Sequence, residues 1–178
     1  GVNKRSFVPS VEMSDCMFEV TERKTRGQEG FLVIFRAQNP DDFYWWNVGG
    51  WRNTKHGLEK KGSQGNAILH HVPGSVETDR DYRLRVVVRG RRLRCWLDGD
   101  LIHDICDATF TTGSVGLGTW NTSVIYREPK LVELDQLGDA SRASFEKKGT
   151  FGTTLAAGVK AWQASSPTQS LPPRALLR

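Results

Sequence analysis

The sequence is organised around residues 43–56, which read FYWWNVGGWRNTKH. Tyrosine and tryptophan rings offer flat apolar faces with a polar edge. Asparagine and histidine offer fixed hydrogen-bond donors and acceptors. This combination suits sugar rings, and it is an unusual composition for a wholly buried segment. The stretch therefore predicts a carbohydrate-binding site.

The same stretch has a second interpretation, in which its alternate residues form one strand of an all-β core. Tyr44 and Trp46 are compatible with either position. Trp51 follows a Gly-Gly bend, which favours an exposed position for its ring. Both interpretations place a strand at the start of the stretch.

The residues around this stretch predict short strands separated by turns. Residues 31–35 form an apolar run of the length of a strand buried on both sides. Residues 39–42 read NPDD, which is turn chemistry, and they place the aromatic stretch in the second arm of a hairpin. Residues 98–99 read DG, the pattern of a two-residue hairpin turn. Many short strands at close intervals predict an all-β fold, a two-sheet antiparallel sandwich.

The chain has 178 residues, which fits one domain of ordinary size with a tail. We predict a lead-in segment at residues 1–12, the β-sandwich at residues 13–137, and a C-terminal extension or linker at residues 138–178. The extension is predicted because residues 165–178 are rich in serine, proline and polar residues. Residues 139–148 could form one or two helical turns.

Several features limit the location and the cofactors of the protein. No apolar run reaches membrane-spanning length, so no membrane partner is expected. The sequence starts at Gly1 without the features of an export signal, so any signal is expected to have been removed or to lie outside it. Three cysteines, Cys16, Cys95 and Cys106, leave at least one thiol unpaired. Without a CxxC motif or a Cys/His cluster, no structural zinc is expected.

The formal net charge of +5 comes with arginines that gather in residues 80–94. A basic face of this kind could attract an acidic polymer, either nucleic acid or a uronate-bearing polysaccharide. The alternative is a solvated outer face of a sheet. Nucleic-acid binding needs basic and aromatic residues interleaved on one surface, and here they are separate in sequence, so no nucleic-acid partner is expected. The arginines concerned are Arg83, Arg85, Arg89, Arg91, Arg92 and Arg94.

A catalytic interpretation finds little support in the carboxylates. Retaining jelly-roll glucanases place acidic residues at alternate positions of one strand. Residues 133–137 read ELDQL, so a leucine occupies the third position. His56 and His103 near Glu59 and Asp104 lack the nucleophile of a triad, and no HExxH motif is present. The sequence predicts a protein that is not an enzyme.

Four aspartates could supply oxygen ligands to a structural calcium ion, which needs six or more such ligands. They are Asp41, Asp42, Asp98 and Asp100. Asp98 is better explained by the chemistry of the hairpin turn. We therefore expect no cofactor, with structural calcium as the alternative.

Four motifs, kept in order along the chain, resemble a known family. They are EGFLVIF at residues 29–35, YWWNVGGWRNTKHGLEK at 44–60, CWLDGDLIHD at 95–104 and GLGTWNT at 116–122. Together they resemble the concanavalin A-like, laminin-G-like module attached to α-L-arabinofuranosidases of glycoside hydrolase family 51. The resemblance covers roughly residues 13–132.

The resemblance implies a concanavalin A-like jelly roll that binds plant polysaccharide containing arabinose or xylose. It also implies an appended catalytic glycoside hydrolase as the partner domain, and an extracellular location. The catalytic barrel of the family is absent from these residues, so its hydrolytic activity is not carried over. Two alternatives stay open: a structural accessory domain that packs on the barrel without a ligand, or a jelly-roll glycoside hydrolase.

On the carbohydrate-binding interpretation, Trp46 and Trp51 would stack on sugar faces. The polar members of the set would bond to sugar hydroxyls, and Trp120 with Asn121 would close one side of the site. The predicted ligand-binding residues are Tyr44, Trp46, Asn47, Trp51, Asn53, His56, Glu59, Trp120 and Asn121.

Overall fold

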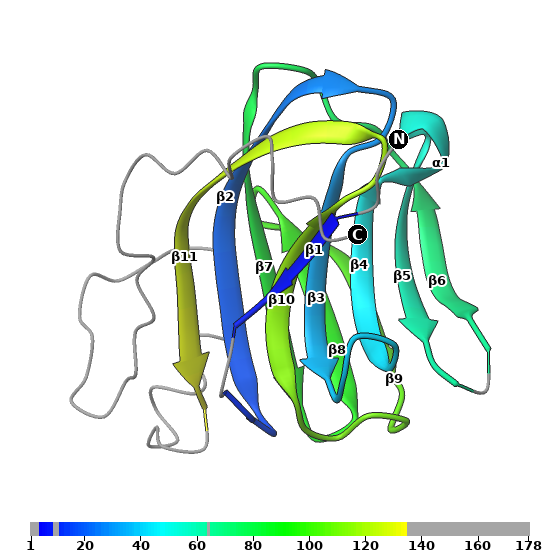
Figure 1. Ribbon diagram of the computed structural model, residues 1–178, viewed down its shortest axis with the longest axis vertical. Helices are drawn as coiled ribbons and strands as arrows, with labels where there is room; N and C mark the ends of the chain where they lie inside the picture. The colour runs from blue at the N-terminus through cyan, green and yellow to red at the C-terminus, as the bar shows by residue number, and fades with distance from the viewer. Residues whose placement is uncertain (1–3, 9–10, 64, 135–178) are drawn as a thin grey trace.

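The computed structural model describes residues 4–8, 11–63 and 65–134, and these form two antiparallel sheets packed face to face (Figure 1). The six-stranded sheet has the order β1 (Lys4–Phe7), β10 (Ser114–Thr119), β3 (Phe31–Ala37), β4 (Phe43–Gly49), β5 (Lys55–Lys61) and β6 (Ala67–Pro73). The five-stranded sheet has the order β11 (Thr122–Glu133), β2 (Cys16–Gly27), β7 (Asp81–Arg89), β8 (Arg92–Leu97) and β9 (Asp100–Cys106). The predicted two-sheet sandwich is confirmed, and its fold is a jelly roll.

Strand β4 shows how alternation along the chain builds the core. Tyr44, Trp46 and Val48 point between the two sheets, and all three are fully buried. Trp45 and Asn47 point to the opposite face and stay half-buried. Burying a large apolar side chain contributes about 1.5 to 3 kcal/mol, so the three inward residues decide which face of β4 meets the core.

The facing wall of the core comes from the middle of the five-stranded sheet. There β2 and β7 pair along their lengths and send alternate apolar residues inward. These inward residues are Cys16, Phe18 and Val20 of β2, with Tyr82, Leu84, Val86 and Val88 of β7.

Strand β3 is buried along its whole length, as its apolar run predicts. Phe31, Val33 and Phe35 join the core between the sheets. On the outer face, Ile34 packs in a second, smaller apolar cluster with Phe43. This buried central strand pairs with β4 along residues 31–35.

The β8–β9 hairpin has the tight turn that the Asp-Gly pair predicts. Asp98 and Gly99 have φ values of 51° and 98°, as a type I′ turn demands at both central positions. The Asp98 carboxylate also accepts a hydrogen bond of 2.8 Å from the backbone N–H of Arg83. Turn chemistry therefore accounts for Asp98.

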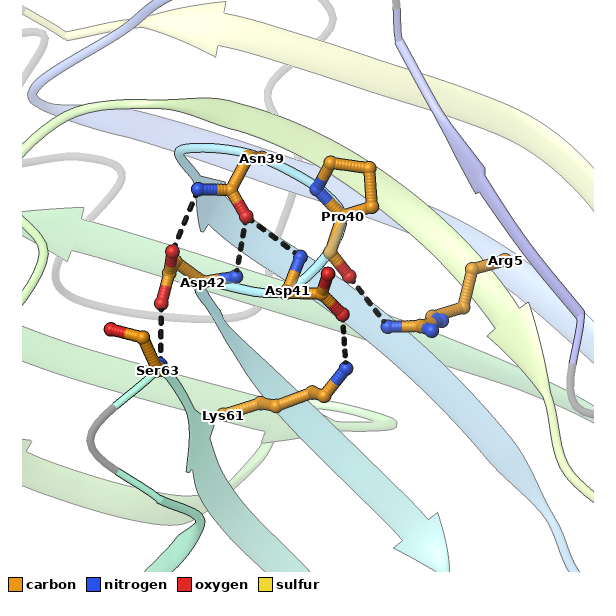
Figure 2. A network of polar contacts seen from close by, with 7 residues as sticks. All are labelled: Arg5, Asn39, Pro40, Asp41, Asp42, Lys61 and Ser63. Carbon is orange, nitrogen blue, oxygen red and sulfur yellow. Dashed lines mark hydrogen bonds and ion pairs between the residues drawn. The ribbon is translucent and has the colours of Figure 1, made fainter.

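The β3–β4 turn is closed by Asn39, whose side-chain oxygen accepts from the backbone N–H groups of Asp41 and Asp42 at 2.8 and 3.0 Å (Figure 2). This is a turn that asparagine forms with its own side chain. The backbone carbonyl of Pro40 accepts from the Arg5 guanidinium at 2.8 Å. The turn is thereby tied to strand β1.

The two aspartates of this turn bind groups at the end of strand β5 and just beyond it. Asp41 forms an ion pair of 2.7 Å with Lys61. Asp42 accepts from the backbone N–H of Ser63 at 2.8 Å (Figure 2). Among residues 4–8, 11–63 and 65–134, no group of three or more side chains is arranged to hold a metal ion.

The predicted domain limits need one correction. Residues 4–7 were predicted as part of a lead-in, yet they form β1 and pair with β10, because an added edge strand satisfies the backbone groups of β10. The predicted extension and its helical turns lie outside the described residues. Within the described part of the chain, no helix is long and apolar enough to cross a membrane.

Candidate functional site

A left-handed turn, α1 (Gly50–Asn53), joins β4 to β5 and carries the third tryptophan of the aromatic stretch. Trp51, Arg52 and Asn53 have φ values of 50°, 61° and 63°, and Gly49 before them has φ 68°. A residue that carries a side chain adopts this left-handed backbone conformation at a cost of about 1 to 2 kcal/mol. Three such residues in succession must be held by contacts from outside the turn.

Those contacts come from two distant segments. The Asn53 side chain donates to the carbonyl of Val76 at 2.8 Å and accepts from the N–H of Val76 at 2.7 Å. The Glu29 carboxylate accepts from the backbone N–H of Arg52 at 2.8 Å. Asn53 is thus a structural residue, because both ends of its amide are used to hold the turn.

The turn places the indole of Trp51 over strand β5. A Cβ atom added at Gly57 would stand 2.4 Å from the ring of Trp51, so the ring lies against the bare backbone of Gly57. The ammonium of Lys55 lies 5.9 Å from the centre of the same ring. Trp51 stays half-buried, and part of its ring therefore faces solvent.

Asn47 and Glu59 lie on the same outer face, on β4 and β5. Gly57 pairs with Asn47, and Glu59 pairs with Trp45. The Asn47 amide donates to the Glu59 carboxylate at 3.3 Å. Burial raises the pKa of the Glu59 carboxyl above its usual range, and this hydrogen bond opposes the rise. We call Trp45, Asn47, Trp51 and Glu59 the Trp51 cluster.

Tyr44, Trp46 and His56 were predicted to bind ligand, and the structure corrects this. Trp46 has 0% exposure and packs in the core, where a sugar cannot reach it. Tyr44 is also fully buried, and its hydroxyl binds the Asp107 carboxylate. Burial, and secondly the hydrogen bond with Asp107, raise the pKa of Tyr44 to about 12.

His56 supports the Trp51 turn from the core side. Its Nδ1 accepts from the backbone N–H of Gly49 at 3.0 Å. Burial lowers the pKa of His56, so its imidazole is neutral and keeps the lone pair that this bond needs. The residue contributes to the site only through the position of the turn.

Trp120 and Asn121 lie at the β10–β11 turn, at the same end of the sandwich as α1 (Figure 1). Trp120 is 50% exposed. Asn121 contacts Gln28 at 3.4 Å, and the next residue, Glu29, holds the Trp51 turn. The β2–β3 turn therefore lies between these two residues and the Trp51 cluster, so they border it rather than join it.

Trp45 belongs to the cluster, although it was not among the predicted ligand-binding residues. Adjacent residues of a strand point to opposite faces. Trp46 and Asn47 were therefore incompatible as members of one site, and Asn47 shares its face with Trp45. The alternation of the strand contained this signal.

The arginine-rich strands form the outer face of the other sheet. Arg85 is only 5% exposed and forms an ion pair of 2.9 Å with Glu19. Arg94 is buried too, with its guanidinium 5.4 Å from the ring of Trp96. A purely solvated face is therefore the wrong description of these two arginines.

Comparison with known proteins gives partial relatives. No family model matches this chain. An extracellular exo-alpha-L-arabinofuranosidase of Streptomyces chartreusis is 42% identical over 85 residues, which are 48% of this chain and 10% of that protein. A levanase of Bacillus subtilis (strain 168) is 26% identical over 129 residues, which are 68% of this chain and 18% of that protein. The chain spans less than a fifth of the length of either relative.

Solved structures share the fold. The carbohydrate-binding module CBM66 from Bacillus subtilis superposes with a TM-score of 0.65 and 21% identity, covering 71% of this chain and 81% of that one. CG-16, a homodimeric agglutinin from chicken liver, has a TM-score of 0.55 and 5% identity, over 72% and 99% of the two chains. The predicted resemblance to a concanavalin A-like module is confirmed, and identities this low carry the fold alone.

Proposed function

We propose that this chain is a non-catalytic module that binds polysaccharide of the plant cell wall containing arabinose or xylose. The observation that carries the proposal is the Trp51 cluster, in which two indoles, an amide and a carboxylate share one outer sheet face. Indole faces pack on the C–H faces of sugars, while amide and carboxylate groups bond to hydroxyls. Similarity to an arabinofuranosidase supports the sugar class.

The proposed role is to bring an appended glycoside hydrolase to its substrate outside the cell. The two partial relatives support it, since one is named as an extracellular arabinofuranosidase and the other as a levanase. This chain matches only a small part of each of them. The site is a sheet face and not a deep pocket, so we expect an affinity in the micromolar to millimolar range, roughly −8 to −4 kcal/mol.

Affinity electrophoresis tests the proposal. The protein is run through gels that contain arabinoxylan, unsubstituted xylan, pectin, levan or β-glucan, and its retardation is compared with that in an empty gel. We expect retardation in arabinoxylan or xylan. Migration unchanged in every gel would overturn carbohydrate binding, and retardation in levan alone would overturn the proposed sugar class.

Variants locate the site. Trp51→Ala and Trp45→Ala are expected to abolish most of the retardation, because each removes a stacking surface. Leu101→Ala is the matched control, since Leu101 is a large apolar residue, 50% exposed, on β9 of the other sheet. Trp120→Ala tests the border of the cluster, and we expect a smaller loss there.

The alternative function, a structural domain that packs on a catalytic barrel and binds no sugar, makes a different prediction. Trp51→Ala would then lower the melting temperature through lost packing, and no polysaccharide would retard the wild-type protein. A variant that keeps its melting temperature and loses its retardation rules this alternative out.

A further inference from the structure

Two histidines meet where the two sheets come together at one edge. His70 lies on β6 and His103 on β9, and these strands are the edges of their sheets and contact each other. The Nδ1 atoms of the two rings are 2.8 Å apart. The ring planes are perpendicular, at 88°, with centroids 5.1 Å apart.

The two rings differ in their access to solvent. His103 is 1% exposed and stands edge-on to the buried indole of Trp46, with centroids 6.0 Å apart. His70 is exposed on the edge strand. Burial, with a smaller effect of the neighbouring His70 and His56, lowers the pKa of His103 to about 3. The His103 ring is therefore enclosed in the core, while the His70 ring is open to solvent.

Two facing ring nitrogens can share either a proton or a metal ion. Imidazole nitrogens bind zinc at about 2.0 to 2.1 Å in a tetrahedral arrangement, so two of them on one ion stand about 3.3 to 3.4 Å apart. The observed separation of 2.8 Å is about 0.5 Å shorter, and a rotation of the exposed His70 ring would supply that adjustment. Imidazole is a preferred ligand of Zn²⁺, Cu²⁺ and Ni²⁺.

We propose that His70 and His103 bind a first-row transition-metal ion between their Nδ1 atoms, with water completing the coordination. The described residues offer no third clustered side-chain ligand, so the site has two protein ligands and stays open to solvent. A bound ion would join β6 to β9 and fasten the two sheets at this edge. The proposal does not depend on carbohydrate binding.

The test uses Zn²⁺ and Cu²⁺ as the probes, in a Cys106→Ser background. This background is needed because Cys106 is an exposed thiol on β9 that could itself bind metal. Ligands that bind only the folded state raise its melting temperature. We expect saturating Zn²⁺ to raise it by roughly 2 to 4 °C, and Cu²⁺ to act at lower concentration, following the usual affinity order.

His70→Ala is expected to remove the rise in melting temperature. It should also remove the saturable Cu²⁺ quenching of the tryptophan fluorescence to which Trp46 contributes. The matched control is His71→Ala, since His71 is exposed on the same strand but pairs across from Gly57 on the outer face. It should behave like the parent protein.

Two outcomes would overturn the site. Equal metal responses in His70→Ala and the parent would place binding elsewhere. No saturable response in the parent would show that the two imidazoles share only a hydrogen bond and bind no metal ion. His70 is exposed, so its replacement by alanine is compatible with folding, and circular dichroism checks this for each variant.

Discussion

The ring of Trp51 rests on the backbone of Gly57, at a distance that leaves no room for a Cβ atom. The contact joins the left-handed turn to strand β5, and it sets where the indole stands beside Asn47 and Glu59. The absence of a side chain at position 57 is therefore part of the proposed site.

Gly57→Ala is expected to lower the affinity for arabinoxylan about tenfold or more, because the added methyl displaces the indole. The cost in stability should be about 1 to 3 kcal/mol, as for other overpacked positions. Isothermal titration and chemical denaturation measure the two effects. Gly62→Ala is the control, since its Cβ would meet neighbours only at ordinary contact distance. Unchanged affinity in Gly57→Ala would show that the position of Trp51 does not matter.

The Asn53 amide is the main support of the left-handed turn, and its replacement separates backbone strain from hydrogen bonding. Asn53→Ala loses two bonds to Val76 and places alanine at φ 63°. We expect a loss of about 2 to 5 kcal/mol, from the left-handed conformation and the two bonds together. Asn53→Gly keeps the conformation without strain, so it should lose less. Equal losses in urea denaturation would mean that the turn stores no strain.

How much of the structure the sequence predicts depends on how far apart in the chain the interacting residues lie. The alternation along β4 and the Asp-Gly turn depend on residues that are close in sequence, and the sequence predicted both. The left-handed turn was predicted only as a Gly-Gly bend, because Glu29 and Val76 hold it from distant parts of the chain. The buried Arg85–Glu19 pair likewise joins residues that are 66 positions apart.

Glu22 lies fully buried on β2, between Tyr126 and Tyr82 of the neighbouring strands. Its two carboxyl oxygens have no hydrogen-bond partner among the described residues. Burial raises the pKa of Glu22 well above its usual value. The folded protein therefore holds a proton that the unfolded chain releases above about pH 4.3. Glu22 therefore makes the free energy of unfolding fall as pH rises from about 4.3 through the raised pKa of the folded state.

Glu22→Gln should remove this contribution, because the amide cannot ionise. The variant is expected to become more stable relative to wild type as pH rises from 4 to 8, by at most about 1.4 kcal/mol per pH unit. Denaturant midpoints at several pH values measure it. Glu77→Gln is the control, since Glu77 is an exposed glutamate. A constant difference between wild type and Glu22→Gln at all pH values would contradict a raised pKa.

The Glu59 carboxylate gives the proposed site its own pH dependence. The ionised group is acceptor-only at both oxygens and accepts hydrogen bonds from sugar hydroxyls more strongly than the protonated group does. Because burial raises the pKa of Glu59, affinity should start to fall on acidification at a higher pH than an ordinary glutamate, near 4.3, would predict. Glu59→Gln should bind more weakly at pH 7, about tenfold, and with no such fall. Titrations at several pH values that show the same fall in the variant would assign it to another group.

The last prediction concerns salt, and it rests on where the arginines lie. Arg85 forms an ion pair with Glu19, and Arg92 forms one with Asp104, so nearby carboxylates neutralise part of the positive charge. These pairs belong to the five-stranded sheet, while the Trp51 cluster lies on the outer face of the six-stranded one.

At the proposed site the Lys55 ammonium lies near the ring of Trp51 and the Glu59 carboxyl lies in the cluster, so charges of both signs are present and we expect no strong preference for a uronate. Stacking on indoles is little affected by salt, whereas attraction between exposed charges is screened above roughly 0.1 M. We therefore expect the affinities for neutral arabinoxylan and for glucuronate-substituted xylan to change by less than about twofold between 0.02 and 0.5 M salt. Titrations of both polymers at the two concentrations measure this. A selective loss for the acidic polymer at high salt would show that the arginine-rich strands attract the ligand, in spite of their ion pairs.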